Sequence, residues 1–299
     1  MTLIKNYLNY IGSKDRLIPI IKSNLDTSKS IFVDMFCGSN TVPTNCLDLP
    51  YKEFISNDGC WQLIELHKWV LNTPLEVVFK RIDAYIEGYK LSKTNKEGFI
   101  KARQTYNEFY SKKDTFEPAL FFCLIMHSFN YSIHLNSSGG FSAPSGYNRS
   151  SFSNTMRNKL VNYKKAWEGR ENDISLHNIK SSIQQVKTLI GNDSIKNTMF
   201  YTDPPYLSSD SSYSRIHGLK WTEDEERELY NTLDYINDFG GSFMLSNVIE
   251  NNGKYNNILH NFIKRNKNYK VIDLSVQYNN CNYQRKNNGK TKEILVINY

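Results

Sequence analysis

The chain has 299 residues, of which 39% are hydrophobic and 13% aromatic, and a formal net charge of +7 at pH 7. This composition excludes an intrinsically disordered chain, which would carry few aromatic residues and a large net charge. The length allows one or two domains with a substantial core. The mild excess of basic side chains favours a polyanionic partner without identifying one.

The five cysteines are scattered and never spaced as C-x-x-C, so neither a disulfide framework nor a thiolate zinc site is indicated. The histidines and acidic residues show no metal-binding spacing, and we expect no metal. The N-terminus lacks a signal-peptide core, and the most apolar stretch, residues 119–126, is too short to span a bilayer. We therefore expect a cytoplasmic protein with no membrane partner.

Apolar runs that end in turn residues predict an α/β sheet. Residues 31–36 predict a buried strand that ends in a tight turn, and residues 53–56 predict a second strand after a crossover helix at 43–49. Further strands are predicted at 197–202, 242–245, 270–278 and 293–298. Thr222 and Glu225 predict the capping box of a helix that follows the strand at 197–202.

The middle of the chain follows a different pattern. Apolar residues recur at helical spacing over residues 61–110, and residues 116–129 predict a further buried helix. Two short extended runs around a Ser/Gly turn, residues 130–144, predict a β-hairpin that a basic stretch follows. The sequence thus predicts a discontinuous sheet domain, residues 1–60 and 172–299, with an inserted, mostly helical domain at 61–171.

Asp203, Pro204, Pro205 and Tyr206 directly follow the strand at 197–202, and open α/β sheets bind ligands at such strand ends. An exocyclic amine conjugated to a purine is a poor nucleophile. The Asp203 carboxylate and the Pro204 carbonyl can accept its two N–H bonds and stabilise positive charge as a methyl group arrives. The prolines fix φ, and the Tyr206 ring can stack on the base. The alternative is a plain Pro-Pro turn after a core strand.

The turn after the first strand indicates a cofactor site. Gly38 lets the backbone approach the methionine part of a cofactor. Asp34 and Asp58, at strand ends, can accept hydrogen bonds from an amino group and from ribose hydroxyls. Each of these features also occurs in ordinary turns, so none identifies the cofactor by itself.

Together these elements resemble the Dam family of DNA adenine-N6 methyltransferases, including the enzymes of T-even phages. The shared motifs, in order along nearly the whole chain, are Y-I-G-S-K at 10–14, F-V-D-M-F-C-G at 32–38, N-D at 57–58, K-L-S-K-T at 90–94, D-P-P-Y at 203–206, S-N-V at 246–248 and E-I-L-V-I-N at 293–298. The resemblance implies a Rossmann-like methyltransferase sheet, S-adenosylmethionine as donor, no metal, and an adenine flipped out of double-stranded DNA.

The resemblance also assigns residues to each ligand. It implies cofactor binding for Tyr10, Lys14, Asp34, Phe36, Gly38, Ser39, Asp58, His177 and Asp203. It implies that the inserted domain recognises the target, through Asn130, Ser132, His134, Asn136, Pro144 and Arg149. Asn40 replaces the last glycine of an F-x-G-x-G turn, and asparagine tolerates the left-handed conformation. His134 stands where relatives that methylate GATC carry a guanine-reading arginine, which disfavours GATC as the target.

Three functional classes stay open. The first is a DNA adenine methyltransferase from a bacterium or phage, solitary or paired with a cognate restriction endonuclease, and a monomer or weak dimer. The second is an RNA or protein-amide methyltransferase, which Asp203 disfavours because glutamine methylators favour asparagine at that position. The third is a catalytically silent DNA-binding relative, which the intact loop 203–206 disfavours.

Overall fold

The computed structural model describes residues 2–9, 12–179, 183–207, 221–274 and 291–299. Its strands are β1 (Ile31–Asp34), β2 (Glu53–Asn57), β3 (Ile174–His177), β4 (Thr198–Thr202), β5 (Ser242–Asn251), β6 (Lys254–Tyr255), β7 (Lys270–Asp273) and β8 (Thr291–Ile297). Its helices are α1 (Ile18–Ser23), α2 (Thr41–Asn45), α3 (Trp61–Asn72), α4 (Leu75–Tyr89), α5 (Lys96–Thr105), α6 (Pro118–His127), α7 (Asn154–Ala166), α8 (Ile183–Ser194), α9 (Glu223–Asp238) and α10 (Asn257–Arg265).

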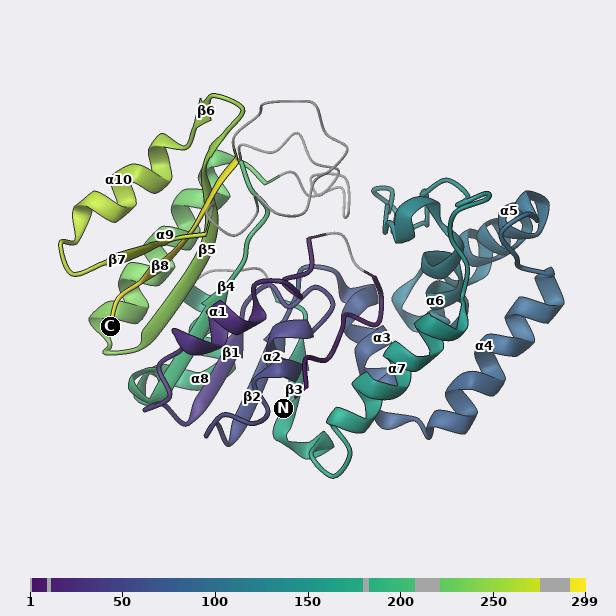
Figure 1. Cartoon of the computed structure of the whole chain (residues 1–299), viewed down its shortest axis with the longest axis horizontal. Coiled ribbons are helices and arrows are strands. Elements are labelled where there is room, and N and C mark those ends of the chain that lie inside the picture. The colour runs from purple at the N-terminus through teal and green to yellow at the C-terminus, as the bar shows by residue number, and fades with distance from the viewer. Residues whose placement is uncertain (1, 10–11, 180–182, 208–220, 275–290) are drawn as a thin grey trace.

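The strands form one sheet in the order β3-β2-β1-β4-β5-β8-β7, with β6 paired to β5 (Figure 1). The strands from β3 to β5 are parallel, whereas β8 runs antiparallel to both β5 and β7. From β1 the chain proceeds outward to β2 and β3, then returns to β4 on the other side of β1. The sheet therefore has its topological switch point between β1 and β4, where open α/β sheets bind ligands.

Helices cover both faces of the sheet because successive strand residues point to opposite sides. Phe32 belongs to a buried cluster with residues of α1 and α2, and this cluster continues into the helices of the insert. Val33, the next residue, belongs to a second buried cluster with residues of α8, α9 and α10. The predicted α/β sheet is thus confirmed, and the segment between β2 and β3, here called the insert, is mostly helical.

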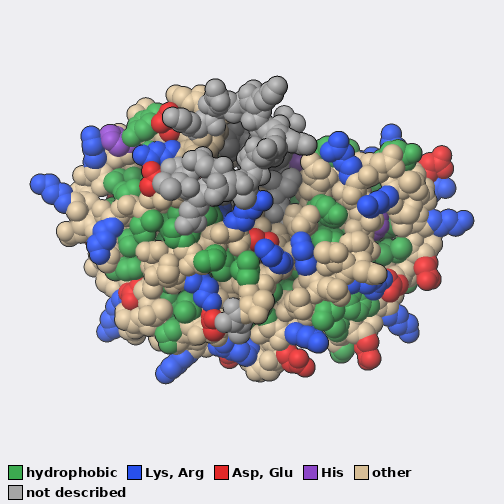
Figure 2. Space-filling view, viewed as in Figure 1, with side chains coloured by type: hydrophobic (Ala, Val, Ile, Leu, Met, Phe, Trp, Pro, Cys, Tyr) green, Lys and Arg blue, Asp and Glu red, His purple; other side chains and the backbone are tan. Residues whose placement is uncertain are grey.

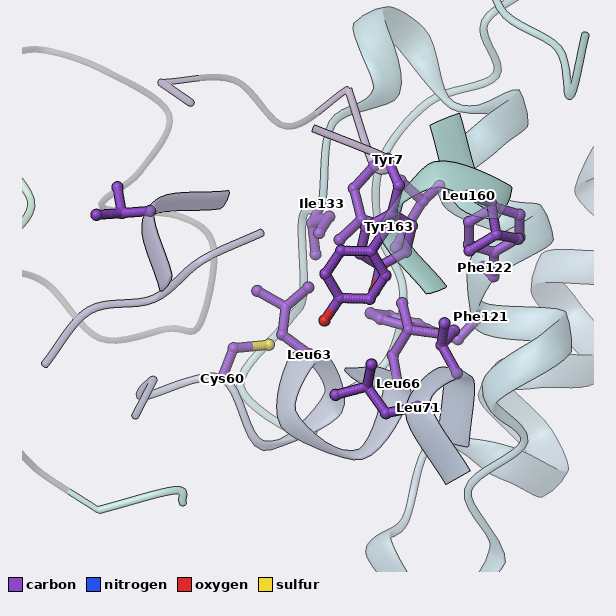
Figure 3. Packing of buried hydrophobic residues seen from close by; sticks show 14 of the residues in the cluster. Tyr7, Cys60, Leu63, Leu66, Leu71, Phe121, Phe122, Ile133, Leu160 and Tyr163 are labelled. Atoms are coloured by element: carbon purple, nitrogen blue, oxygen red, sulfur yellow. The ribbon is translucent and has the colours of Figure 1, made fainter. Parts of the chain in front are cut away.

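The insert is built around α6, in which every residue from Ala119 to His127 is buried. Helices α3, α4 and α5 pack around it, and α3 also contacts β3 at the edge of the sheet (Figure 1). Figure 3 shows Phe121 and Phe122 of α6 close to Leu66 of α3 and Tyr163 of α7. Because this cluster runs on to the sheet, the insert and the sheet share one hydrophobic core.

Most predicted elements are present, including the capping box of Thr222 and Glu225 at the start of α9. The crossover helix is shorter than predicted and begins earlier, at Thr41. The hairpin expected at 130–144 has isolated antiparallel bridges, one of which joins Leu135 to Phe141, in place of continuous strands. Helices α8 and α10 and strand β3 were not predicted. No helix in the described part of the chain is long and apolar enough to cross a bilayer.

His67 of α3 fixes the turn that follows β1. Its Nε2 lies 2.8 Å from the Gly38 carbonyl oxygen and its Nδ1 lies 2.8 Å from the Tyr7 hydroxyl. A carbonyl only accepts, so Nε2 carries the hydrogen and Nδ1 accepts from Tyr7. Burial lowers the pKa of His67 to about 4, so the ring is neutral near pH 7.

The neutral ring predicts that the protein loses stability as the pH falls from 6.5 towards about 4. In this window the unfolded chain binds a proton at His67 that the folded chain excludes, which lowers the free energy of unfolding by up to about 3 kcal/mol. His67→Gln retains an N–H donor for Gly38 but does not titrate. In urea unfolding at pH 7, 5.5 and 4.5, the stability advantage of the wild type over this variant should narrow as the pH falls. An advantage that is independent of pH would contradict the assignment.

Candidate active site

The ends of β1 and β4 lie side by side at the switch point. Asp34, the last residue of β1, pairs in register with Tyr201 of β4, and the Met35 N–H donates to the Tyr201 carbonyl at 3.0 Å. The segments that follow, residues 35–39 and 203–206, therefore leave the sheet next to each other. The structure thus brings the two predicted ligand-binding turns to one edge of the sheet.

Lys14 holds the Asp203 carboxylate. Its Nζ lies 2.5 Å from Asp203 Oδ2 and 3.1 Å from the Tyr206 hydroxyl. The same Nζ lies 3.8 Å from Oε1 of Glu293 on β8, so one cation faces two carboxylates. Burial acts to lower the pKa of Lys14, but the charges of Asp203 and Glu293 outweigh it and raise this pKa above its usual value. The lysine is therefore charged at physiological pH.

The Tyr206 hydroxyl lies between the same two carboxylates. It is 2.9 Å from Asp203 Oδ1 and 3.1 Å from Glu293 Oε1. Burial, with the nearby charges of Asp203 and Glu293, raises the pKa of Tyr206 well above its usual value, so the hydroxyl keeps its proton. Pro204 is buried and Pro205 is half-buried in the same loop. Stacking of the Tyr206 ring on a base stays a prediction.

The turn after β1 is arranged around Asp58, at the end of β2. Its Oδ2 accepts the Gly38 N–H at 2.9 Å and its Oδ1 accepts the Cys60 N–H at 2.7 Å. Gly38 has a φ of 48°, in the left-handed region that glycine adopts without strain. This geometry fixes the backbone of the turn where the sequence predicted a close approach to a cofactor.

Asp34 is a buried carboxylate that faces the same region. Its Oδ1 accepts the Phe36 N–H at 3.1 Å. Burial raises the pKa of Asp34 well above its usual value, and the negative charges of Asp203 and Asp58 add to this rise. A carboxylate in this state is suited to receive a cationic group, which would stabilise its charged form.

Asn40 adopts the left-handed conformation that was expected of it, with a φ of 57°. Its Nδ2 donates to the Tyr163 hydroxyl of α7 at 3.0 Å, and its Oδ1 accepts from Ser56 of β2 at 2.7 Å. Asparagine can therefore replace glycine here, and its side chain additionally ties the turn to the insert.

The other residues with an implied cofactor role surround this edge. The Phe36 ring meets the Trp221 ring edge-on, 5.6 Å between centres, and the Ser39 hydroxyl bonds to Thr41 at 2.8 Å. The His177 carbonyl accepts the Asp58 N–H at 3.2 Å. Tyr10 lies outside the described residues. Among the described residues no group of histidine, cysteine and acidic side chains is placed to hold a metal ion.

The residues with an implied DNA role lie on the irregular loop after α6. Several have structural contacts there: the Ser132 hydroxyl donates to the Phe129 carbonyl at 2.7 Å, and Asn136 Oδ1 accepts from the Ser138 and Gly140 N–H groups. The Pro144 carbonyl accepts the Phe129 N–H at 2.9 Å.

Several residues of this loop are also exposed and placed to meet a ligand. Asn130, with a φ of 54°, Asn136 and Pro144 are exposed, and His134 is half-buried. Arg149 is exposed, and its guanidinium carbon lies 5.0 Å from the centre of the Phe129 ring. In Figure 2, Lys and Arg side chains occur on the viewed face over both the sheet and the insert.

Two buried acidic residues of the site were not predicted. Glu293 lies in the E-I-L-V-I-N motif. The sequence feature that could have identified it is an acidic residue at the start of the buried part of a strand. Glu226 of α9 is fully buried and accepts from Trp221 Nε1 at 2.6 Å and from Asn256 Nδ2 at 2.9 Å. Its partner Trp221 is only five residues away, but Asn247 and Asn256 come from β5 and the start of α10, and no local pattern brings these two to it.

Comparison with known proteins gives consistent results. A family model described as D12 class N6 adenine-specific DNA methyltransferase matches residues 10–279. The chain is 33% identical over 303 residues to Modification methylase StsI of Streptococcus sanguinis and 31% identical over 302 residues to Type II methyltransferase M.FokI of Planomicrobium okeanokoites. It is 27% identical over 299 residues to Modification methylase LlaI of Lactococcus lactis subsp. lactis. Each match covers 99% of this chain but 43% of the relative, so the chain spans less than half the length of these proteins.

The ion pair at the centre of the site predicts a stability effect. Lys14→Met leaves two adjacent carboxylates without this cation, and we expect the free energy of unfolding at pH 7 to fall by about 3 kcal/mol. The matched control is Lys22→Met, because the Lys22–Asp48 pair is more exposed, at 21% and 30% against 9% and 18% for Lys14–Asp203. The control should lose less than about 1 kcal/mol. Equal losses in urea unfolding would contradict the prediction.

Proposed function

The chain belongs to the D12 class N6 adenine-specific DNA methyltransferase family, and from this premise we propose that it methylates N6 of an adenine flipped out of duplex DNA. The adenine-N6 methyltransferase family that the sequence predicted is confirmed. The methyl donor in this proposal is S-adenosylmethionine. The observation that carries the proposal is the Asp203 carboxylate, held by Lys14 at the switch point of the sheet.

Asp203 and Pro204 would hold the base. An adenine amine has two N–H bonds, and the proposed acceptors are the Asp203 carboxylate and the Pro204 carbonyl. A carboxylate offers about four acceptor positions, so Asp203 can bind Lys14 and still accept from the amine. These acceptors would stabilise the positive charge that develops on the nitrogen, and they are fixed before the base arrives. Flipping is required because the amine is out of reach inside the base stack.

The turn after β1 fits the donor. S-adenosylmethionine would supply an electrophilic methyl group on a sulfonium. Asp34, buried and with a raised pKa, is suited to the cationic amino group of the donor, and Asp58 is suited to its ribose hydroxyls. Phe36, Gly38, Ser39 and His177 would complete the site. A cofactor role for Lys14, which contacts Asp203, stays a prediction, as does one for Tyr10.

We assign residues 61–171 to target recognition, and residues 1–60 and 172–299 to catalysis. The loop residues Asn130, His134 and Arg149 would contact DNA, with Ser132, Asn136 and Pro144 shaping the loop. Histidine lacks the bidentate guanine contact of arginine, so His134 argues against GATC as the target. The relatives' names, modification methylase and type II methyltransferase, support a place in a restriction-modification system with a cognate endonuclease. We propose that the protein acts as a monomer or weak dimer.

Replacement of Asp203 tests the proposed chemistry. With tritiated S-adenosylmethionine and unmethylated duplex DNA of mixed sequence, Asp203→Ala should lower the rate of DNA labelling by at least about 10²-fold, because an acceptor for the developing charge is lost. DNA binding should be unchanged. Asp238→Ala, at the exposed end of α9, is the control and should label DNA normally. Labelling of RNA or protein but not of DNA by the wild type would overturn the proposal.

Replacement of Arg149 tests the DNA-binding surface. Arg149→Ala should raise the Kd for duplex DNA about tenfold and reduce the slope of log Kd against log salt by about one. Arg227→Ala removes an exposed arginine of α9, outside the insert, and should change neither quantity. Fluorescence anisotropy at several salt concentrations measures both. Equal effects of the two substitutions would show that the loop has no special role.

A further inference from the structure

Glu293 is a buried carboxylate, 8% exposed, and it has no role in the chemistry proposed above. It lies on β8, opposite Val248 of β5 in the sheet register. Its Oε1 lies 3.1 Å from the Tyr206 hydroxyl, 3.4 Å from the Ser246 hydroxyl and 3.8 Å from Lys14 Nζ. A residue of the last strand therefore reaches the loop that would hold the base.

The Tyr206 hydroxyl has two carboxylate acceptors within hydrogen-bond distance, Asp203 and Glu293. A tyrosine hydroxyl has one hydrogen, so it can donate to Asp203 Oδ1 or to Glu293 Oε1, but not to both at full strength. Lys14 already donates to Asp203 Oδ2. When Tyr206 donates to Asp203, it takes one of about two acceptor positions on Oδ1 and weakens that oxygen as an acceptor for the adenine amine. When it donates to Glu293, Asp203 Oδ1 can receive the adenine amine.

We infer that Glu293 is a positioning residue for methyl transfer: it accepts the Tyr206 hydroxyl and so releases Asp203 Oδ1 for the adenine amine. The inference rests on the proposed function. The ionised form of Glu293 matters, because a hydrogen bond to a charged acceptor is roughly twice as strong as one to a neutral acceptor. With a neutral residue at this position, the hydroxyl would prefer the Asp203 carboxylate and compete with the base. Glu293 also shares Lys14, which limits how far that cation neutralises Asp203.

Glu293→Gln separates this role from a structural one. Glutamine retains the shape and a neutral acceptor but loses the charge. With enzyme in excess over acceptor sites in unmethylated duplex DNA, the first-order rate of methyl transfer should fall about tenfold, and the dissociation constants of DNA and donor should stay within about twofold. The control is Lys292→Gln at the preceding position, whose exposed side chain pairs with Asp273, and it should retain the wild-type rate.

The Tyr206→Phe background gives the decisive comparison. Phenylalanine has no hydroxyl to redirect, so Glu293→Gln should slow transfer in this background by less than about threefold, a non-additive result. An active wild type with an unchanged Glu293→Gln rate, or an equal loss in both backgrounds, would overturn this inference alone. A wild type that methylates no DNA would overturn the proposed function and this inference with it.

Discussion

The Lys14–Asp203 ion pair is the interaction on which the candidate site depends. One buried ammonium faces two carboxylates from segments far apart in sequence, and the hydroxyl of Tyr206 lies between them. Removing two carboxylates from water is costly unless a cation and hydrogen bonds compensate. The site meets this requirement with side chains from the N-terminal segment, the loop after β4 and strand β8. The D-P-P-Y loop supplies Tyr206 as one partner of Asp203, and tertiary structure supplies the other, Lys14.

Side-chain hydrogen bonds and a shared hydrophobic cluster join the sheet to the insert. His67 and Tyr163, both from the insert, bond to Gly38 and Asn40 in the turn after β1. The hydrophobic cluster that surrounds α6 extends on to one face of the sheet. A displacement of α3 or α7 by bound DNA would therefore act on the turn that is proposed to hold the donor. The proposed DNA-binding and donor-binding sites are thus connected by direct contacts, although they come from different parts of the chain.

Sequence patterns predicted the sheet because its strands are buried apolar runs that end in turn residues, and they predicted the D-P-P-Y loop because it directly follows such a run. The left-handed conformation of Asn40 was also foreseen. The hairpin was predicted with continuous strands, but Asn130 and Tyr131 have positive φ angles that interrupt an extended backbone. Glu293 and Glu226 could not be assigned from sequence, since their partners are set by strand and helix packing. The contact of Lys14 with Asp203 could not be predicted for the same reason: a motif identifies the residue, but only the fold brings it to Asp203.

The central claim is that an aspartate and a proline carbonyl at the tip of β4 present the amine of a purine to a methyl donor. Nucleoside mass spectrometry of duplex DNA incubated with the chain and S-adenosylmethionine tests it most directly. We expect N6-methyldeoxyadenosine as the sole new nucleoside, formed at a limited set of sites. A methyl group on cytosine, or none in DNA despite tight binding of both ligands, would contradict it.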